Sequence, residues 1–304
     1  LVNYLLAKNY SVINLDKNSY ASTPEKFKII KNKKKYRYFE IDLLNKKKLF
    51  SFIKKFKPKT IIHLAAESHV DRSINKYEFF IKNNILGTFN LLNITKEVYS
   101  YKKNIKFIHI STDEVYGSNT QQPSKENSAY KPRSPYSASK AGSDHIATAF
   151  VHTYNLPIII LNLCNNYGSY QFTEKFIPTV IFNLLNNKKI PIYGNGKNIR
   201  EWLYVEDCCR AIEMIIKRGK IGDHYNIGSG VRCNNLDLVK KIHKIMKKLN
   251  LINNVYKKSI KFVKDRPGHD FRYALNSSLF KKKTKWNCKS SLVKGLKKTI
   301  QWYL

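Results

Sequence analysis

Several features that would point to a membrane, metal or disulfide-bonded protein are missing from this sequence. No apolar run approaches the ~20 residues that a membrane-spanning helix needs. The five cysteines are scattered and odd in number, and none has the CxxC spacing typical of a zinc site. We therefore expect no metal, no transmembrane helix, and free thiols in a reducing cytoplasm.

The sequence also lacks a GxGxxG or GxxGxxG turn, the element that holds a pyrophosphate against a helix N-terminus in dinucleotide-binding folds. It has no initiator Met, and residues 1–9 have the pattern of the end of a helix. Two explanations are open: the chain is a fragment of a longer protein, or it has lost tight cofactor binding. The opening residues favour the fragment.

Acidic residues are scarce, with 21 Asp and Glu against 56 Lys and Arg, a net charge of +35. A nucleic-acid-binding protein would gather its lysines on one face, between aromatic residues. Here they are spread along the chain, as in 33–35, 46–48 and 281–283. We interpret them as solvated surface that also steers a doubly charged nucleotide toward a cleft.

What the chain does contain is an alternation of strand and helix patterns. The 304 residues, 42% of them hydrophobic, are enough for a substantial core. We expect strands near 11–16, 36–41, 60–64, 106–110 and 158–163, and helices over 46–56, 77–99 and 136–154. This order predicts an α/β fold with a doubly wound parallel sheet covered on both faces.

Asp16 is the first candidate for contact with a cofactor. In a dinucleotide-binding fold an acid ends the second strand and bonds the ribose 2′-OH. Asp16 follows a predicted strand and has no Arg beside it to receive a 2′-phosphate, which favours NAD over NADP. The neighbouring Lys17 weakens that inference.

The most informative feature is a pair of acids, Asp113 and Glu114, followed by Tyr136 and Lys140. The acids come where an apolar strand ends. They either act together as an acid and a base in catalysis or cap a helical turn. Tyr136 and Lys140 are four residues apart, so they lie on one helix face, where the ammonium favours a phenolate that acts as a base. Neighbouring carboxyls repel each other's second charge, which separates their pKa values into an acid and a base. The set predicts redox and elimination chemistry at a carbinol carbon.

A series of further stretches accompanies these residues, in order from Val12 to the C-terminus: 63–73, 112–114, 136–141, 165–168, 191–194, 200–207 and 265–270. Through them the sequence resembles the dTDP-glucose 4,6-dehydratase family of the extended short-chain dehydrogenases/reductases. An Asp-Glu pair after Thr is the narrowest of these signals, because the whole superfamily shares the Tyr/Lys pair.

The resemblance implies an NAD-dependent hydro-lyase that converts dTDP-glucose to dTDP-4-keto-6-deoxyglucose. NAD would be retained, oxidising C4 transiently and returning the hydride to C6 after water leaves across C5 and C6. Tyr136 would take the 4-OH proton, and Lys140 would lower the Tyr136 pKa and hold the nicotinamide ribose. Glu114 would take the C5 proton, Asp113 would protonate the departing 6-OH, and Thr112 would orient the hexose.

The same resemblance implies two sets of contacts. Those to the cofactor are Asp16, Lys17, Asn18, Ser19, Asp42, Leu43, Leu64, Ala65, Ala66, Glu67, Ser68, Asn83, Tyr136, Lys140 and Asn166. Those to the substrate are Ser68, Thr112, Asn165, Lys175, Phe176, Pro191, Ile192, Tyr193, Arg200, Asn235, Asp265, Arg266, Pro267, Gly268 and His269.

The resemblance also implies a division into domains, an oligomeric state and a cellular compartment. Residues 1–168 would form the NAD-binding Rossmann domain without its first strand and glycine loop, and 169–304 mainly a nucleotide-sugar-binding lobe. We expect a cytoplasmic homodimer built through the helices at 77–99 and 136–154, with no nucleic acid or membrane as partner. The alternatives are a dehydratase or epimerase for a UDP- or GDP-sugar, and a degenerate basic nucleic-acid-binding protein with this fold.

Overall fold

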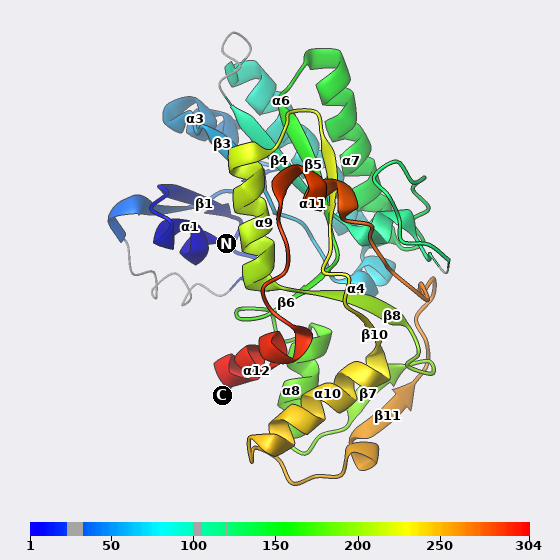
Figure 1. The fold of residues 1–304 in the computed structure, drawn as a ribbon. Helices are drawn as coiled ribbons and strands as arrows, with labels where there is room; N and C mark the ends of the chain where they lie inside the picture. The colour runs from blue at the N-terminus through cyan, green and yellow to red at the C-terminus, as the bar shows by residue number, and fades with distance from the viewer. Residues whose placement is uncertain (23–32, 100–104, 120) are drawn as a thin grey trace. The chain divides into compact units, whose positions relative to one another are not determined.

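The computed structural model describes residues 1–22, 33–99, 105–119 and 121–304 (Figure 1). They form two compact units, each gathered from segments far apart in the sequence. Unit 1 comprises Leu1–Ser111, Pro135–Leu161 and Ile212–His224; unit 2 comprises Thr112–Ser134, Asn162–Ala211 and Tyr225–Leu304. The expected division into domains 1–168 and 169–304 stays a prediction.

The strands of unit 1 pair in parallel, as the alternating pattern predicts. β1 (Val12–Asp16) pairs with β2 (Tyr36–Glu40), and β3 (Thr60–His63) pairs with β4 (Lys106–Thr112). The second sheet has the order β3-β4-β5-β9, which adds β5 (Ile158–Leu163) and β9 (His224–Ile227). Of β9, only His224 is assigned to unit 1. In the doubly wound order the first strand lies between these two sets, and no strand described here joins β1 to β3. The prediction of an α/β fold with parallel sheets is confirmed.

The helix α3 (Lys46–Phe56) shows how the local sequence sets an element. The Asn45 side chain accepts a hydrogen bond from a backbone N–H of the first turn, which caps the helix. Leu49, Phe52 and Ile53 recur at helical spacing and are buried, while the lysines face outward. The predicted bounds, 46–56, agree with the structure.

The helix expected over 77–99 is interrupted by a wider turn. Inside that turn Asn84 is 1% exposed and bonds both backbone groups of Glu67, with N–O distances of 2.8 and 3.0 Å. It also donates to Ser139 Oγ at 2.9 Å. The prediction of one regular helix was wrong, because these tertiary bonds favour a local π-helical geometry. The three pieces are α5 (Tyr77–Phe80), the π-helical η2 (Ile81–Leu86) and α6 (Gly87–Tyr99).

The helix α7 (Pro135–Tyr154) confirms the prediction for 136–154. It packs against α6, η2 and α4 (Val70–Asn75), and Figure 1 shows it beside β4 and β5. The apolar side chains between these elements form one core, which includes Phe107, Phe150 and Ile158. This packing fixes the helix that carries Tyr136 and Lys140.

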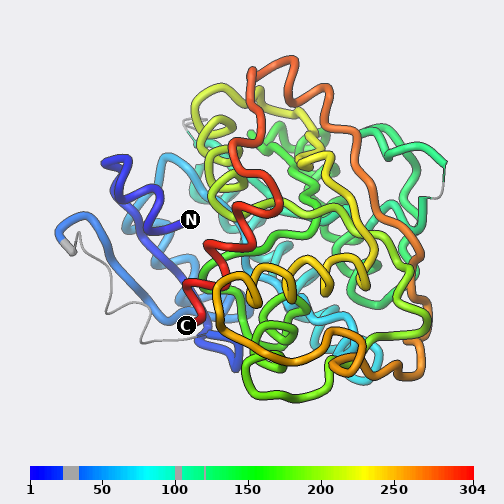
Figure 2. Tube along the Cα trace, turned by 60° about the horizontal axis from the view of Figure 1, so that its bottom comes forward, coloured from blue at the N-terminus to red at the C-terminus, as the bar shows by residue number. Residues whose placement is uncertain are grey.

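Unit 2 contains two small sheets and a group of packed helices. β10 (Arg232–Asn234), β8 (Ile199–Tyr204) and β6 (Asn165–Tyr167) form one sheet; β7 (Ile190–Tyr193) and β11 (Ile260–Val263) form the other. The helices α8 (Phe176–Leu185), α10 (Asn235–Lys248) and α12 (Leu292–Tyr303) pack on one another, and Figure 2 shows α10 and α12 side by side. No helix within the described ranges has the length and apolar character that a bilayer crossing would require. The remaining elements are α1 (Val2–Ala7), α9 (Val205–Arg218), α11 (Ser278–Thr284) and the short turns η1 (Lys33–Lys35), η3 (Asp113–Tyr116) and η4 (Tyr256–Ser259).

A buried carboxylate, Glu201, ties β8 to the neighbouring segments of unit 2. It is fully buried, accepts from Arg232 Nε at 3.0 Å, and accepts from the backbone N–H groups of Gly230 and Leu275. We expect Glu201→Ala to lower the free energy of unfolding by about 3–5 kcal/mol, since it leaves Arg232 without its buried partner. Denaturant unfolding measures this.

The matched control is Glu206, whose ion pair with Lys298 lies at the surface. Solvent screens that pair, so Glu206→Ala should change the unfolding free energy by less than about 1 kcal/mol. Equal losses in the two variants would contradict the role given to Glu201.

Candidate active site

The carboxyl end of β4 runs directly into η3, whose first two residues are the predicted acids. Thr112 caps this turn, and its Oγ1 accepts from the Glu114 N–H at 3.3 Å. Gly117 ends it at φ +71°, where a Cβ would lie 2.2 Å from the Lys131 carbonyl oxygen, so glycine is required. The acids therefore lie in the first turn of this helix, but the capping side chain is Thr112 and neither acid. Asp113 is also buried, which a place in a first helical turn does not require.

Asp113 is placed as an uncharged acid. It is 3% exposed, and within the described residues its Oδ2 has no hydrogen-bond partner. Burial raises its pKa well above the usual range, and the charges of Glu114 and Glu201 raise it further. Its Oδ1 accepts from Thr112 Oγ1 at 3.3 Å, but a buried carboxylate with one oxygen unpaired is costly, which favours the protonated form.

Glu114, only partly buried, has a different electrostatic environment. Burial raises its pKa too, but three cations oppose the rise. These are Arg200, Arg266 and Lys175. Because they stabilise the ionised form, Glu114 is the better base of the two acids.

Two residues beside Glu114 were not among the predicted site residues. The Tyr273 hydroxyl donates to Asp270 Oδ2 at 2.8 Å and lies 3.4 Å from Glu114 Oε2. Burial raises the pKa of Tyr273, so it stays a neutral donor. In the sequence only their position could have pointed to them: Asp270 ends the 265–270 stretch, and Tyr273 follows three residues later.

A second cluster forms where β7 and β11 end. These strands are parallel, so their carboxyl ends meet at one edge and bring Tyr193 near the segment that follows Val263. The Arg266 guanidinium lies 5.2 Å from the centre of the Tyr193 ring, and His269 Nδ1 lies 2.6 Å from Asp265 Oδ1. Four predicted substrate residues are thus brought together.

Other predicted substrate residues are less open to a ligand. Arg200 is 7% exposed, donates to the carbonyls of Ile199 and Asp270, and lies over the Tyr273 ring at 4.3 Å. Ile192 is 1% exposed and belongs to the core, so only its backbone is available for contact. The contacts expected of these two residues stay predictions.

The asparagines of β6 offer acceptors that are not used within the described residues. The side-chain oxygens of Asn165 and Asn166 are buried and have no hydrogen-bond partner there. Buried amide oxygens are normally bonded, so a ligand donor would complete them. The remaining predicted substrate residues of unit 2 are Lys175, Phe176, Pro191, Asn235, Pro267 and Gly268.

Unit 1 has a cavity of about 260 Å³ that reaches the carboxyl ends of β1 and β3. Carboxylates at 16 and 42 and apolar side chains line it, a donor set suited to the hydroxyls and the base of an adenosine. The residues present therefore fit the adenosine half of a dinucleotide. Ten of the predicted cofactor contacts line it: Asp16, Lys17, Ser19, Asp42, Leu43, Leu64, Ala65, Ala66, Glu67 and Asn83. Asn18 and Ser68 belong to the same unit, and Asn166 to unit 2.

Lys17 is engaged by its neighbours in this cavity. Its Nζ lies 2.9 Å from Glu67 Oε1 and 2.6 Å from Asn83 Oδ1. The Asp16 carboxylate accepts from the Asn18 N–H and the Ser22 hydroxyl. Glu67 compensates the positive charge of Lys17. Lys17 therefore argues less strongly for NADP, and against NAD, than its place beside Asp16 in the sequence suggested.

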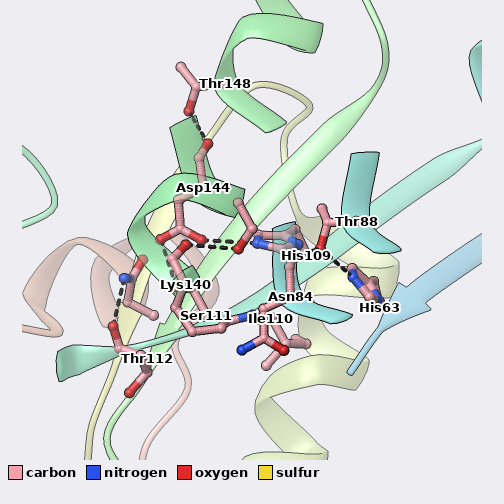
Figure 3. Close-up of polar contacts among 12 residues, drawn as sticks. His63, Asn84, Thr88, His109, Ile110, Ser111, Thr112, Lys140, Asp144 and Thr148 are labelled. Carbon is pink, nitrogen blue, oxygen red and sulfur yellow. Dashed lines mark hydrogen bonds and ion pairs between the residues drawn. The ribbon is translucent and has the colours of Figure 1, made fainter. Parts of the chain in front are cut away.

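Tyr136 and Lys140 lie on successive turns of α7 in unit 1, both buried. Lys140 Nζ donates to the Ile110 carbonyl at 2.8 Å (Figure 3). Burial lowers the Lys140 pKa, and the nearby Asp144 opposes that shift. The spacing predicted a shared helix face, and the observed helix provides it.

Comparison with known proteins agrees with these features. The family model described as GDP-mannose 4,6 dehydratase matches residues 1–299. A probable dTDP-glucose 4,6-dehydratase of Sinorhizobium fredii is 42% identical over 310 residues, covering 100% of this chain and 89% of that protein. The dTDP-glucose 4,6-dehydratase DesIV of Streptomyces venezuelae, with NAD and TYD bound, superposes with a TM-score of 0.91 at 36% identity, covering 99% and 92%.

The dTDP-glucose 4,6-dehydratase of Bacillus anthracis, in complex with NAD, gives a TM-score of 0.87 at 37% identity and covers 99% of this chain and 91% of that one. Both solved structures extend the likeness from the sequence to the whole fold, and they confirm the Rossmann-type assignment. The chain belongs to the dTDP-glucose 4,6-dehydratase family of the short-chain dehydrogenases/reductases.

Proposed function

We propose that this protein dehydrates dTDP-glucose to dTDP-4-keto-6-deoxyglucose with NAD as a retained cofactor. The observation that carries the proposal is the pair at the end of β4. Asp113 is buried with its pKa raised well above the usual range, whereas three cations favour the ionised form of Glu114. Elimination of water from a sugar needs one carboxyl group of each kind.

The cavity of unit 1 is where we place the adenosine half of NAD. Asp16 would accept from its ribose, and Lys140 would donate to the nicotinamide ribose. NAD held there would supply reversible hydride transfer, from C4 of the hexose and back to C6. The NAD-bound structures of the Streptomyces and Bacillus relatives support this choice.

Tyr136 begins the reaction by removing the proton of the sugar 4-OH. A phenol does this near neutral pH when a cation stabilises its phenolate, and Lys140 is four residues away on the same helix face. Proton removal and oxidation together leave a ketone at C4. That ketone acidifies the hydrogen at C5.

The two acids then complete the elimination. Glu114 takes the proton from C5, and the C5–C6 double bond forms as the C6–O bond breaks. Asp113 gives its proton to the leaving oxygen, so that water departs. Thr112 orients the hexose through its hydroxyl, and a proton returned to C5 gives the product.

The nucleotide end of the substrate is assigned to the cluster around Tyr193. The Tyr193 ring would stack on the thymine, and the guanidinium groups of Arg266 and Arg200 would face the diphosphate. The Streptomyces relative was crystallised with TYD, which supports a dTDP ligand.

Incubation of the NAD-loaded protein with dTDP-glucose tests the activity. We expect a product with the alkali-sensitive near-ultraviolet absorbance of a 4-keto-6-deoxy sugar nucleotide, and slower turnover of UDP-glucose and GDP-mannose. Mass spectrometry of the native protein establishes the NAD content beforehand. No keto product from protein shown to carry NAD would overturn the proposal, and a 4-epimer as the product would move the chain to the epimerases.

A homodimer in the cytoplasm is part of the proposal. Exposed aromatic and aliphatic side chains gather on α5, η2, α6 and the end of α7, and a second copy of the chain would bury them. They are Tyr77, Phe79, Ile81, Leu86, Phe89 and Tyr154. The five cysteines, all free thiols, suit a reducing compartment. Sedimentation at micromolar concentration should give twice the chain mass, and a monomer there would remove the dimer from the proposal.

A further inference from the structure

An acid on α7, Asp144, lies one helical turn beyond Lys140 and takes no part in the proposed mechanism. It is 2% exposed, so burial of its charge must be compensated. Its Oδ1 lies 2.9 Å from His109 Nε2, and its Oδ2 accepts from Ser111 Oγ at 2.6 Å. Figure 3 shows these contacts joining α7 to β4.

The two partners of Asp144, His109 and Ser111, flank Ile110, whose carbonyl accepts a hydrogen bond from Lys140. Residues two apart in a strand point to the same side, which brings both His109 and Ser111 to the carboxylate. Between them the Ile110 carbonyl accepts from Lys140 Nζ at 2.8 Å. Asp144 thus holds the segment of β4 that positions the lysine.

The histidine beside Asp144 is neutral, so it does not cancel the carboxylate charge. His109 is fully buried, and its Nδ1 has no hydrogen-bond partner within the described residues. Protonation would bury an unpaired N–H there, which is costly. Burial also lowers the pKa of His109.

The other titratable groups around Asp144 add no further positive charge to compensate the carboxylate. His63, from β3, and His224, at the start of β9, both have pKa values lowered by burial. The Asp144 pKa is itself lowered, although burial opposes the shift, because His109, Lys140 and Ser111 stabilise the carboxylate. Among the described residues of this cluster, Asp144 is therefore the group whose negative charge offsets the burial of the Lys140 ammonium.

We propose that Asp144 is a positioning residue for catalysis: it keeps Lys140 protonated in a buried site and fixes the Ile110 carbonyl to which Lys140 donates. The inference rests on the proposed function, because its benefit is the phenolate of Tyr136. Without the carboxylate, burial alone would act on Lys140, and its proton would be lost at a lower pH. A neutral lysine no longer favours the phenolate.

The variant Asp144→Asn separates charge from hydrogen bonding. The amide oxygen still accepts from His109 and the amide N–H donates to Ser111, but the negative charge is gone. Ser111→Ala is the matched control, since it removes one hydrogen bond and keeps the carboxylate. Both substitutions are small and change the same contact.

Labelling of amines with cyanate across a pH series, mapped by mass spectrometry, reports on Lys140 directly, because only the neutral amine reacts. For Asp144→Asn we expect the Lys140 midpoint to fall by about one pH unit, a tenfold faster reaction below the midpoint. The midpoint should not move in Ser111→Ala. Exposed lysines of the same samples are internal controls.

The shape of the pH curve distinguishes the alternatives. A merely structural role would raise the labelling rate at high pH, where access limits it, and leave the midpoint in place; that result would overturn the inference. Cyanate labelling needs neither substrate nor turnover. A shifted midpoint without any keto product would therefore reject the proposed function and retain Asp144 as the group that charges Lys140.

Discussion

Replacing Asp113 by Asn is expected to stop the loss of water while sparing the first oxidation of the sugar. The amide has nearly the same shape but cannot give a proton to the leaving oxygen, so turnover should fall by about 10²–10⁴-fold. Reduction of the cofactor precedes that step and does not use Asp113. Mixing the variant with dTDP-glucose should therefore build up the near-ultraviolet absorbance of reduced nicotinamide without the keto product.

The companion variant Glu114→Gln divides the two roles further. It removes the base and should prevent exchange of the C5 hydrogen with deuterated solvent, whereas Asp113→Asn should allow that exchange. Deuterium content of recovered sugar, measured by mass spectrometry, reads this out. Loss of exchange in the Asp113 variant alone would invert the assignment of acid and base.

The second large effect is expected for Tyr136→Phe. Removing the hydroxyl removes the base that begins the reaction, so both cofactor reduction and product formation should fall by about 10²–10⁴-fold. The ring stays in its buried place on α7, so folding should be retained. Rapid-mixing measurement of cofactor reduction tests the first step alone.

Tyr99→Phe is the control for losing a phenol in the same unit. Its hydroxyl donates to the Pro58 carbonyl at 2.6 Å, so the change removes one structural hydrogen bond. Its cost should appear as about 1 kcal/mol of stability and not in the rate of reduction. A Tyr136 variant that reduces the cofactor at the parent rate would exclude the phenol as the base.

The acids show which part of the site was readable from the sequence. Their place at the end of a strand follows from the apolar run before them. The neighbouring charge predicted that their two pKa values separate, and only the family resemblance named Asp113 as the acid. The structure changes the reason, because burial contributes more than Glu114 does. A local pattern reveals a neighbour in sequence but not how deeply a side chain is enclosed.

Tertiary contacts account for what the sequence did not reveal. The stretch 77–99 was predicted to be one regular helix, yet Asn84 bonds to Glu67 and Ser139 and changes its geometry. Tyr273 reaches Glu114 across 159 positions of the chain. Asp144 was visible as an acid one turn after Lys140, but its partners on β4 were not. Single elements such as α3 were predictable because their own spacing decides them.

The wide turn η2 also restricts how this stretch of chain can change in length. Each residue of an α-helix advances the side-chain direction by about 100°, so removing one residue would re-phase everything after it. The face of α6 that carries Leu91, Leu92 and Thr95 would then rotate out of the core. Length variation should therefore accumulate in exposed connections such as 186–189, between α8 and β7, while η2 keeps its residue count.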